Sequence, residues 1–238
     1  MTITLQHQSY YRIIIKTHAT TKIIATKKGV FEMQENNDKT SNSRRRRTVS
    51  RTYRGFELGN EEAYDAKLLD AEIDVLNASL EKHSKILVKR FDLHLPQDTP
   101  QEQCKEVLSE VTGEIVRNFN RSRTRGVEKP RPALDPKYMM TVERKESNQP
   151  HAHAIITFNG NAVEKGYYPT QEIKEIVERK LGSPALVHEC KDGEWLLHRG
   201  NEEELAEVVR ATSYISKVRT KEKNRGRELM RSQLKRKK

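Results

Sequence analysis

Apolar and polar side chains alternate most regularly over Ile86–Leu95. Because successive side chains of a strand point to opposite faces, this period of two predicts a strand with one core face and one open face. The core face carries Leu87, Lys89, Phe91, Leu93 and Leu95. The open face, whose three polar groups can look into a site, carries Val88, Arg90, Asp92 and His94. Pro96 ends the strand, since proline cannot donate to a sheet ladder.

Apolar residues recur at helical spacing in other parts of the chain. The stretches with this spacing are Asn60–Lys82, Thr99–Phe119, Pro169–Gly182 and Asn201–Val218. We expect Asn60, Thr99 and Asn201 to be N-caps, because each has a side-chain oxygen that can accept from the first free amides of a helix. The pattern therefore predicts amphipathic helices that pack on the sheet.

Pairs of short apolar runs predict two β-hairpins. In the first, Tyr138–Glu143 is followed by a polar turn and by the apolar, β-branched run His151–Phe158. In the second, Ala185–His188 and Glu194–Leu197 are joined about an Asp-Gly pair at 192–193, which favours a tight turn. The order strand, helix, hairpin, helix, hairpin, helix predicts an α+β fold with a central antiparallel sheet of about five strands flanked by helices.

Charge changes the picture at both ends of the chain. The formal net charge is +11 and the pI about 9.6, a balance that suits a polyanion such as nucleic acid. Residues 1–58 lack a clear period and include the block Arg44–Arg47, so we expect a flexible basic N-terminal arm that contacts phosphates or serves as a solvated linker. Residues 59–224 form the expected domain, opened by a leading helix over 59–84, and 225–238 form a flexible basic C-terminal tail.

Other features of the composition exclude several classes of protein. Cys104 and Cys190 are the only cysteines, and they lack the spacing of a disulfide framework or a zinc ribbon. No apolar run approaches the ~18 residues of a membrane span. The short apolar cluster near the N-terminus is not long enough for a secretion signal. We therefore expect a cytoplasmic protein with no membrane partner.

The pair His151 and His153 is the first candidate for chemistry. With one residue between them, the two imidazoles share a face of their strand and can hold one ion. Glu143 ends the preceding strand and is placed to join them, whereas Glu146 in the turn is the weaker carboxylate candidate. Two neutral imidazoles and a carboxylate make a divalent-metal site that can still accept a substrate oxygen. Two half-exposed strand histidines without a ligand are the alternative.

A tyrosine in the last predicted helix is the second candidate. Tyr214 and Lys217 stand three residues apart, which places them on one face of a helix. The ammonium group can stabilise a phenolate, a competent nucleophile, and it can equally hold a phosphate. A half-buried packing role for Tyr214 is the alternative. A metal that polarises a phosphodiester and a phenol that attacks it would together make a complete reaction.

These residues give the chain a resemblance to a known family. It resembles the HUH-type endonucleases, and within them the inovirus-like replication initiators that carry the YagK/YfjJ C-terminal domain. The segments LVKRFDLHLP, MMTVERKESNQPHAHAIITFNG and ATSYISKVRTK carry the resemblance, which spans roughly Ile86 to Lys221. Ala152, between the two histidines, is small for a position that the family fills with a hydrophobic residue.

The resemblance implies a role for each candidate residue. It makes His151, His153 and Glu143 the ligands of Mg²⁺ or Mn²⁺. It makes Tyr214 the nucleophile and Lys217 its partner, and it leaves Tyr167 and Tyr168 in a loop without a matching lysine. The strand beside the site supplies supporting groups, which are Asp92 and His94. The cations expected to contact the DNA backbone are Arg121, Arg123, Arg125, Arg219 and Lys221.

The implied function is a replication initiator for rolling-circle replication. It would nick single-stranded DNA at an origin, keep the 5′ phosphate on tyrosine and leave a 3′-hydroxyl as primer. A host helicase and polymerase are the further partners that this reaction needs. Two alternatives stay open: a non-catalytic DNA-binding regulator on the same scaffold, and a relaxase or transposase with the same chemistry.

Overall fold

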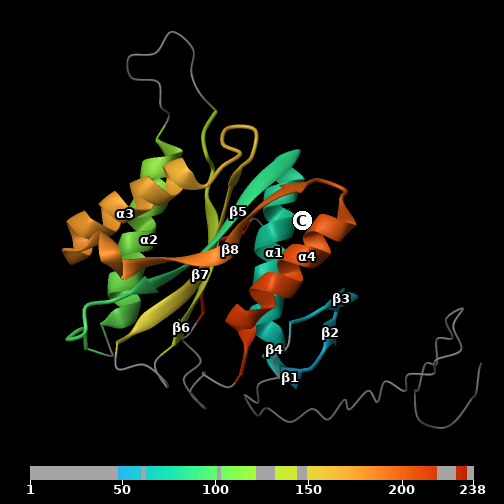
Figure 1. Cartoon of the computed structure of the whole chain (residues 1–238), viewed down its shortest axis with the longest axis horizontal. Helices are drawn as coiled ribbons and strands as arrows, with labels where there is room; N and C mark the ends of the chain where they lie inside the picture. Colours follow the sequence, from blue (N-terminus) through green and yellow to red (C-terminus); the bar gives the residue numbers. More distant parts are fainter. Residues whose placement is uncertain are drawn as a thin grey trace, which may run out of the picture. The chain divides into compact units, whose positions relative to one another are not determined.

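The computed structural model describes residues 48–59, 63–100, 103–121, 132–143, 149–218 and 229–234. Its centre is a five-stranded antiparallel sheet with the strand order β8-β5-β7-β6-β9 (Figure 1). In that order the strands are Val187–His198, Lys85–His94, His151–Asn159, Lys137–Glu143 and Leu229–Arg231. The first predicted hairpin is confirmed as β6 and β7, and the predicted strand over Ile86–Leu95 is β5.

Helices cover both faces of this sheet (Figure 1). Helices α2 and α3 pack on one face, and α1 and α4 pack on the other. In chain order the helices are α1 (Ala66–Lys82), α2 (Cys104–Asn120), α3 (Tyr167–Leu181) and α4 (Glu202–Thr212), with short 3₁₀ turns η1 (Pro184–Leu186) and η2 (Ser213–Ser216). The α+β class and the antiparallel sheet are therefore as predicted. None of the described helices is both long and apolar enough to cross a membrane.

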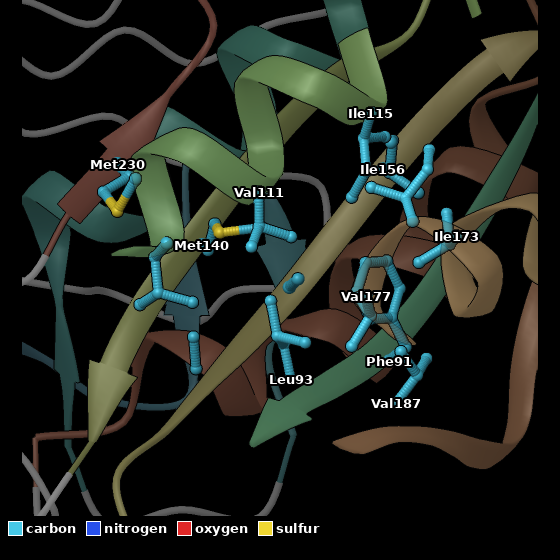
Figure 2. Close-up of a cluster of buried hydrophobic side chains, with 14 of the residues drawn as sticks. Phe91, Leu93, Val111, Ile115, Met140, Ile156, Ile173, Val177, Val187 and Met230 are labelled. Atoms are coloured by element: carbon cyan, nitrogen blue, oxygen red, sulfur yellow. The ribbon is translucent and has the colours of Figure 1, made fainter. Parts of the chain in front are cut away.

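The face under α2 and α3 holds the larger core (Figure 2). Helix α2 lays Val111 and Ile115 over the sheet, and α3 adds Ile173 and Val177. The strands contribute alternate residues to this core, which include Phe91, Leu93, Met140, Ala152, Ala154 and Ile156. Burying these side chains fixes which residues of β5, β6 and β7 must point to the opposite face. The period-two pattern thus orients the polar residues as well as the apolar ones.

The predicted helix starts were wrong for α1 and α2. Helix α1 begins at Ala66 rather than at Asn60, which lies outside the described residues, and its N-cap is Asp65. The Asp65 carboxylate accepts from the amides of Lys67 at 2.9 Å and Leu68 at 3.4 Å. Helix α2 begins at Cys104, and its N-cap position has no side-chain hydrogen bond. Thr99 lies outside that helix. Only Asn201 of the three expected caps is confirmed, since its side chain accepts from the amide of Glu204.

The second predicted hairpin was also wrong. Both of its runs pair with β5 instead of with each other, so β8 is one strand at the sheet edge. Glu194 stands opposite Lys89 and Glu189 opposite Phe91, which leaves residues 190–193 opposite Arg90 alone. Asp192, with a φ of 54°, and Gly193 therefore form a bulge rather than a hairpin turn. Aspartate and glycine both tolerate a positive φ, which a bulge and a tight hairpin turn can each require.

Both segments predicted as flexible contribute strands. The arm over 1–58 includes β1 (Thr48–Val49), β2 (Thr52–Tyr53) and β3 (Phe56–Glu57), and β1 pairs with β4 (Tyr64–Asp65). The tail over 225–238 supplies β9, whose Met230 is buried in the core beside Met140 (Figure 2). Apolar residues among many cations were too few to give a periodic signal in either segment.

Asp135 joins the end of α1 to the start of β6. Its carboxylate lies 2.8 Å from Lys82 Nζ, 2.8 Å from His83 Nε2 and 3.0 Å from Lys137 Nζ. Burial acts to raise the pKa of Asp135, but the hydrogen bonds from these three groups outweigh it and lower the pKa from 3.8 to about 2. The ionised form is thus favoured by folding, so Asp135 stabilises the fold above pH 4 and loses this contribution as the pH falls toward 2.

We predict that Asp135→Asn lowers the free energy of unfolding by about 1–2 kcal/mol at pH 6, a value discounted for the partial exposure of the group. Asparagine tolerates the positive φ of 46° at this position, so the backbone is preserved. Urea unfolding between pH 3 and pH 7 should show the difference from wild type shrinking as the pH falls. The exposed Asp98, changed to Asn, is the control. A difference that stays constant with pH would contradict the assignment.

Candidate metal centre and tyrosine

The antiparallel register gathers the candidate metal ligands at one end of the sheet. His151 of β7 stands opposite His94 of β5 on one side and Glu143 of β6 on the other. His153 stands opposite Asp92. Ligand atoms of Glu143, His151 and His153 all lie within 4.8 Å of one another. The structure therefore brings together the three residues predicted as ligands.

Two carboxylates hold the His153 ring in one orientation. Asp92 Oδ1 lies 2.6 Å from Nδ1 of His153, and Glu143 Oε2 lies 3.2 Å from Nε2. The second contact is close but not aligned, because buried Nε2 makes no hydrogen bond within the described part of the chain. A ring that donates Nδ1–H to a carboxylate presents the lone pair of Nε2 to a metal, the arrangement common in metal proteins.

The electrostatics of this pair follow from burial and proximity. Burial acts to lower the pKa of His153, but the hydrogen bond to Asp92 and the nearby carboxylates of Asp92 and Glu143 outweigh it and raise that pKa. Burial acts to raise the pKa of Asp92, yet the His153 hydrogen bond and nearby cations lower it. A proton on Nε2 thus takes the place that a cation would take, and metal binding would release it.

The Nε2 atom of His151 can also bind a metal ion. Its Nδ1 lies 3.3 Å from the carbonyl oxygen of Gln149, and its ring stacks on His94 with centroids 5.3 Å apart. Burial, and then the charge of His151, lower the pKa of His94. A neutral His94 ring adds no positive charge beside the ligands. We therefore place both Asp92 and His94 against the ligands, as the sequence suggested.

The Tyr214 ring lies beside the histidines and between cationic groups. Its centroid is 5.5 Å from that of His153, 3.6 Å from Lys217 Nζ and 5.0 Å from Arg90 Cζ. Lys217 Nζ also lies 3.5 Å from Glu143 Oε2, and its side chain is only 3% exposed. The lysine thus links the tyrosine to the metal ligands and has little access to solvent.

Tyr214 and Lys217 do not lie on an α-helix, contrary to the prediction. Helix α4 ends at Thr212, Tyr214 is in the 3₁₀ turn η2, and Lys217 follows that turn in an isolated bridge to Tyr64. The hydroxyl groups of Thr212 and Ser213 bond to the carbonyl oxygens of Val208 and Arg210, which competes with regular helix geometry. Three-residue spacing also aligns side chains in a 3₁₀ turn.

Buried contacts fix this turn on both sides of the tyrosine. The hydroxyl oxygens of Thr212 and Ser216 lie 2.5 and 3.4 Å from the two carboxyl oxygens of Glu72 on α1, within hydrogen-bond distance. Thr141 of β6 donates to the carbonyl oxygen of Ile215 at 3.2 Å. Glu72, Thr141, Thr212, Ser216 and Ile215 are all buried, whereas Tyr214 is partly exposed. The contacts hold the phenol at the surface of a rigid turn.

The remaining predicted residues are placed differently or not described. Arg121 is exposed and follows α2, whose Phe119 packs on Phe158 at the end of β7 opposite to His151. Arg121 therefore lies away from the metal ligands. Tyr167 and Tyr168 begin helix α3 rather than lying in a loop. The predicted residues outside the described part are Arg123, Arg125, Glu146, Arg219 and Lys221.

The sequence analysis missed Glu72 and Thr141 and left Arg90 without a role. Glu72 falls in the buried stripe of α1, where a carboxylate among apolar residues was the available signal. Burial raises the pKa of Glu72 from 4.5 to about 8, although hydrogen bonds from Thr212 and Ser216 and the charge of Arg90 act to lower it. Its protonated form is thus favoured by folding, so the fold loses stability as the pH rises from 4.5 to 8.

We predict that Glu72→Gln removes this loss, because glutamine keeps the shape and cannot ionise. The melting temperature of the variant should exceed that of wild type at pH 8–9, and the two should converge toward pH 4.5. Differential scanning calorimetry across this range would measure both. Glu110→Gln, on the exposed face of α2, is the matched control and should follow wild type. A Glu72→Gln variant whose pH profile equals that of wild type would refute a buried neutral carboxyl group here.

The donor set fits a divalent cation. The buried Nε2 of His153 makes no hydrogen bond to a described group and faces the Glu143 carboxylate. Ligand atoms of these two residues and of His151 lie within 4.8 Å of one another. Two imidazoles and one carboxylate can bind a divalent cation and leave coordination positions for further ligands. The phenol ring of Tyr214 lies beside this donor set, with its centroid 5.5 Å from that of His153.

Comparison with curated proteins and with solved structures finds no match. The model of the YagK/YfjJ C-terminal domain matches residues 47–229. This range begins just before β1 and reaches the first residue of β9, so it covers strands β1 to β8, helices α1 to α4 and the candidate metal centre. The chain belongs to the YagK/YfjJ C-terminal domain family.

Proposed function

We propose that this protein is an HUH-type replication initiator that nicks single-stranded DNA with Tyr214. One observation carries the proposal: a partly exposed tyrosine on a rigid turn lies against His153 of a two-histidine, one-carboxylate cluster. The strongly basic composition supports a polyanionic substrate. Glu143, His151 and His153 would hold the divalent ion, which when bound supplies Lewis-acid polarisation of a phosphate oxygen.

The reaction assigned to the chain is a transesterification at phosphorus. Tyr214 Oη forms a bond to phosphorus, and the bond from phosphorus to the 3′ oxygen breaks. The departing oxygen takes the electron pair and a proton to become a 3′-hydroxyl, and the phenolic proton goes to solvent. The products are a 5′-phosphotyrosyl link and a primer end. Lys217 stabilises the negative charge that develops on the phenol, and its contact with Glu143 fixes its position.

The nucleophile can be tested with a covalent-adduct assay. Wild-type protein incubated with single-stranded DNA from the origin of its own replicon and Mn²⁺ should form an adduct stable to denaturation. Tyr214→Phe should form none, because the attacking oxygen is lost while the ring packing is kept. Peptide mapping by mass spectrometry should find the nucleotide on Tyr214. Tyr167→Phe is the control, since this exposed tyrosine on α3 should leave the yield unchanged. A nucleotide found on any other residue would contradict the assignment.

The metal centre can be tested without cleavage. His153→Ala removes the ligand that Asp92 orients, so Mn²⁺ affinity should fall by at least about 10–100-fold, the range seen when a supporting group alone is lost. Isothermal titration calorimetry, or the EPR signal of free Mn²⁺, would measure the change. His198→Ala, at the exposed far end of β8, is the matched control. Equal Mn²⁺ affinity in the His153 variant and wild type would reject the centre.

A further inference from the structure

An arginine that forms no ion pair with any described residue lies next to the tyrosine. Arg90 projects from β5 on the same face as Asp92, because the two are separated by one residue. Its Cζ lies 5.0 Å from the centre of the Tyr214 ring. Within the described part of the chain, no carboxylate oxygen lies within 4.0 Å of its guanidinium nitrogens. The residue is partly exposed, so a ligand can reach it.

The same guanidinium has an unused donor. Its Nε is buried and makes no hydrogen bond to any described group. Buried donors in native proteins almost always have a partner, so an unpaired one beside a candidate site points to a ligand. Asp92 and Glu72 are acidic groups whose charges interact with Arg90, but neither forms an ion pair with it. Asp92 is hydrogen-bonded to His153, and Glu72 is buried with a raised pKa.

The other cation at the tyrosine is not available for this role. Lys217 is 2% exposed and its ammonium group is held between the Glu143 carboxylate and the tyrosine ring. A substrate phosphate would have to displace that buried ion pair to reach it. Arg90 can accept an oxyanion without breaking any ion pair, and a planar guanidinium offers parallel donors that match two phosphate oxygens.

We propose that Arg90 binds the backbone phosphodiester of single-stranded DNA and holds its phosphorus against Tyr214. The proposal rests on the proposed function, since it assigns the substrate contact of the same site. It makes Arg90 a catalytic residue of the nicking reaction, distinct from the metal ligands and from Lys217. The ligand is recognised by charge and by paired phosphate oxygens, so this contact carries no preference for a base.

The test observes Arg90 directly in the Tyr214→Phe protein, which cannot cleave. The ¹⁵N–¹H resonance of the Arg90 Nε, assigned by its loss in Arg90→Lys, should shift when an oligothymidylate of about ten nucleotides is added without metal. In the same background, Arg90→Gln should flatten the slope of log K against log salt by about 0.7, the value for one phosphate contact on a single strand. Arg117→Gln is the control, because Arg117 is exposed on the opposite face and paired with Glu114 at 2.7 Å.

A second readout measures catalysis. With Tyr214 present, Arg90→Gln should slow adduct formation by about 100-fold, the effect of losing one oxyanion donor, whereas Arg117→Gln should not. An unchanged Nε resonance on saturation with the oligonucleotide would overturn the proposal, and this measurement keeps Arg90 in place, so it does not require Arg90→Gln to fold. A shifted Nε resonance in a protein that never forms an adduct would reject the nicking function while upholding phosphodiester binding by Arg90.

Discussion

The register in which β7 pairs with β5 and β6 is the constraint on which the rest of the site depends. Ala152, Ala154 and Ile156 are buried under α2 and α3, so His151 and His153 must face the other side. A slip of one residue would turn both imidazoles into the apolar core under α2 and α3 and the alanines toward the site. The apolar core under α2 and α3 thus determines which way His151 and His153 point, although these side chains lie on the opposite face of the sheet. Pairing on both sides then supplies each histidine with a carboxylate across a strand boundary.

The tyrosine is positioned by a different mechanism, which is a short turn held by buried polar contacts. Glu72 reaches it from α1 and Thr141 from β6, so two separate elements of the fold fix one turn. Buried hydrogen bonds of this kind are directional, and they specify one arrangement more strictly than apolar packing does. Because the residues before and after Tyr214 are buried, the phenol can face the histidines only in one way. A neutral Glu72 serves this purpose without adding negative charge beside the site proposed to bind a phosphodiester.

Period-two alternation made the sheet and the candidate metal ligands predictable from the sequence. The alternation in β5 and β7 alone placed Asp92 with His94, and His151 with His153, on one face of each strand. Pairing of the two strands then set Asp92 opposite His153 and His94 opposite His151. Local chemistry predicted the helix caps poorly, because Asp65 and Asn60 are both competent cap residues and the helix begins after Asp65. It also failed at 192–193, where an Asp-Gly pair suits a bulge as well as a turn. Contacts between distant segments, such as Glu72 with the tyrosine turn and Met230 with the core, have no signal in a single sequence.

The balance of charge connects the structure to the chemistry proposed for it. Asp92 and Glu143 are each matched by a neighbouring group, His153 for the first and His153 with Lys217 for the second. Arg90 is left without a match among the described residues, and a divalent ion at Glu143 and the histidines would add further positive charge. A centre of this kind binds negative charge best when that charge is brought in by a ligand, because its own carboxylates are already engaged. In the proposed reaction a phosphodiester and a developing phenolate would supply that negative charge together, which would make the site more complementary to the reacting state than to the free tyrosine.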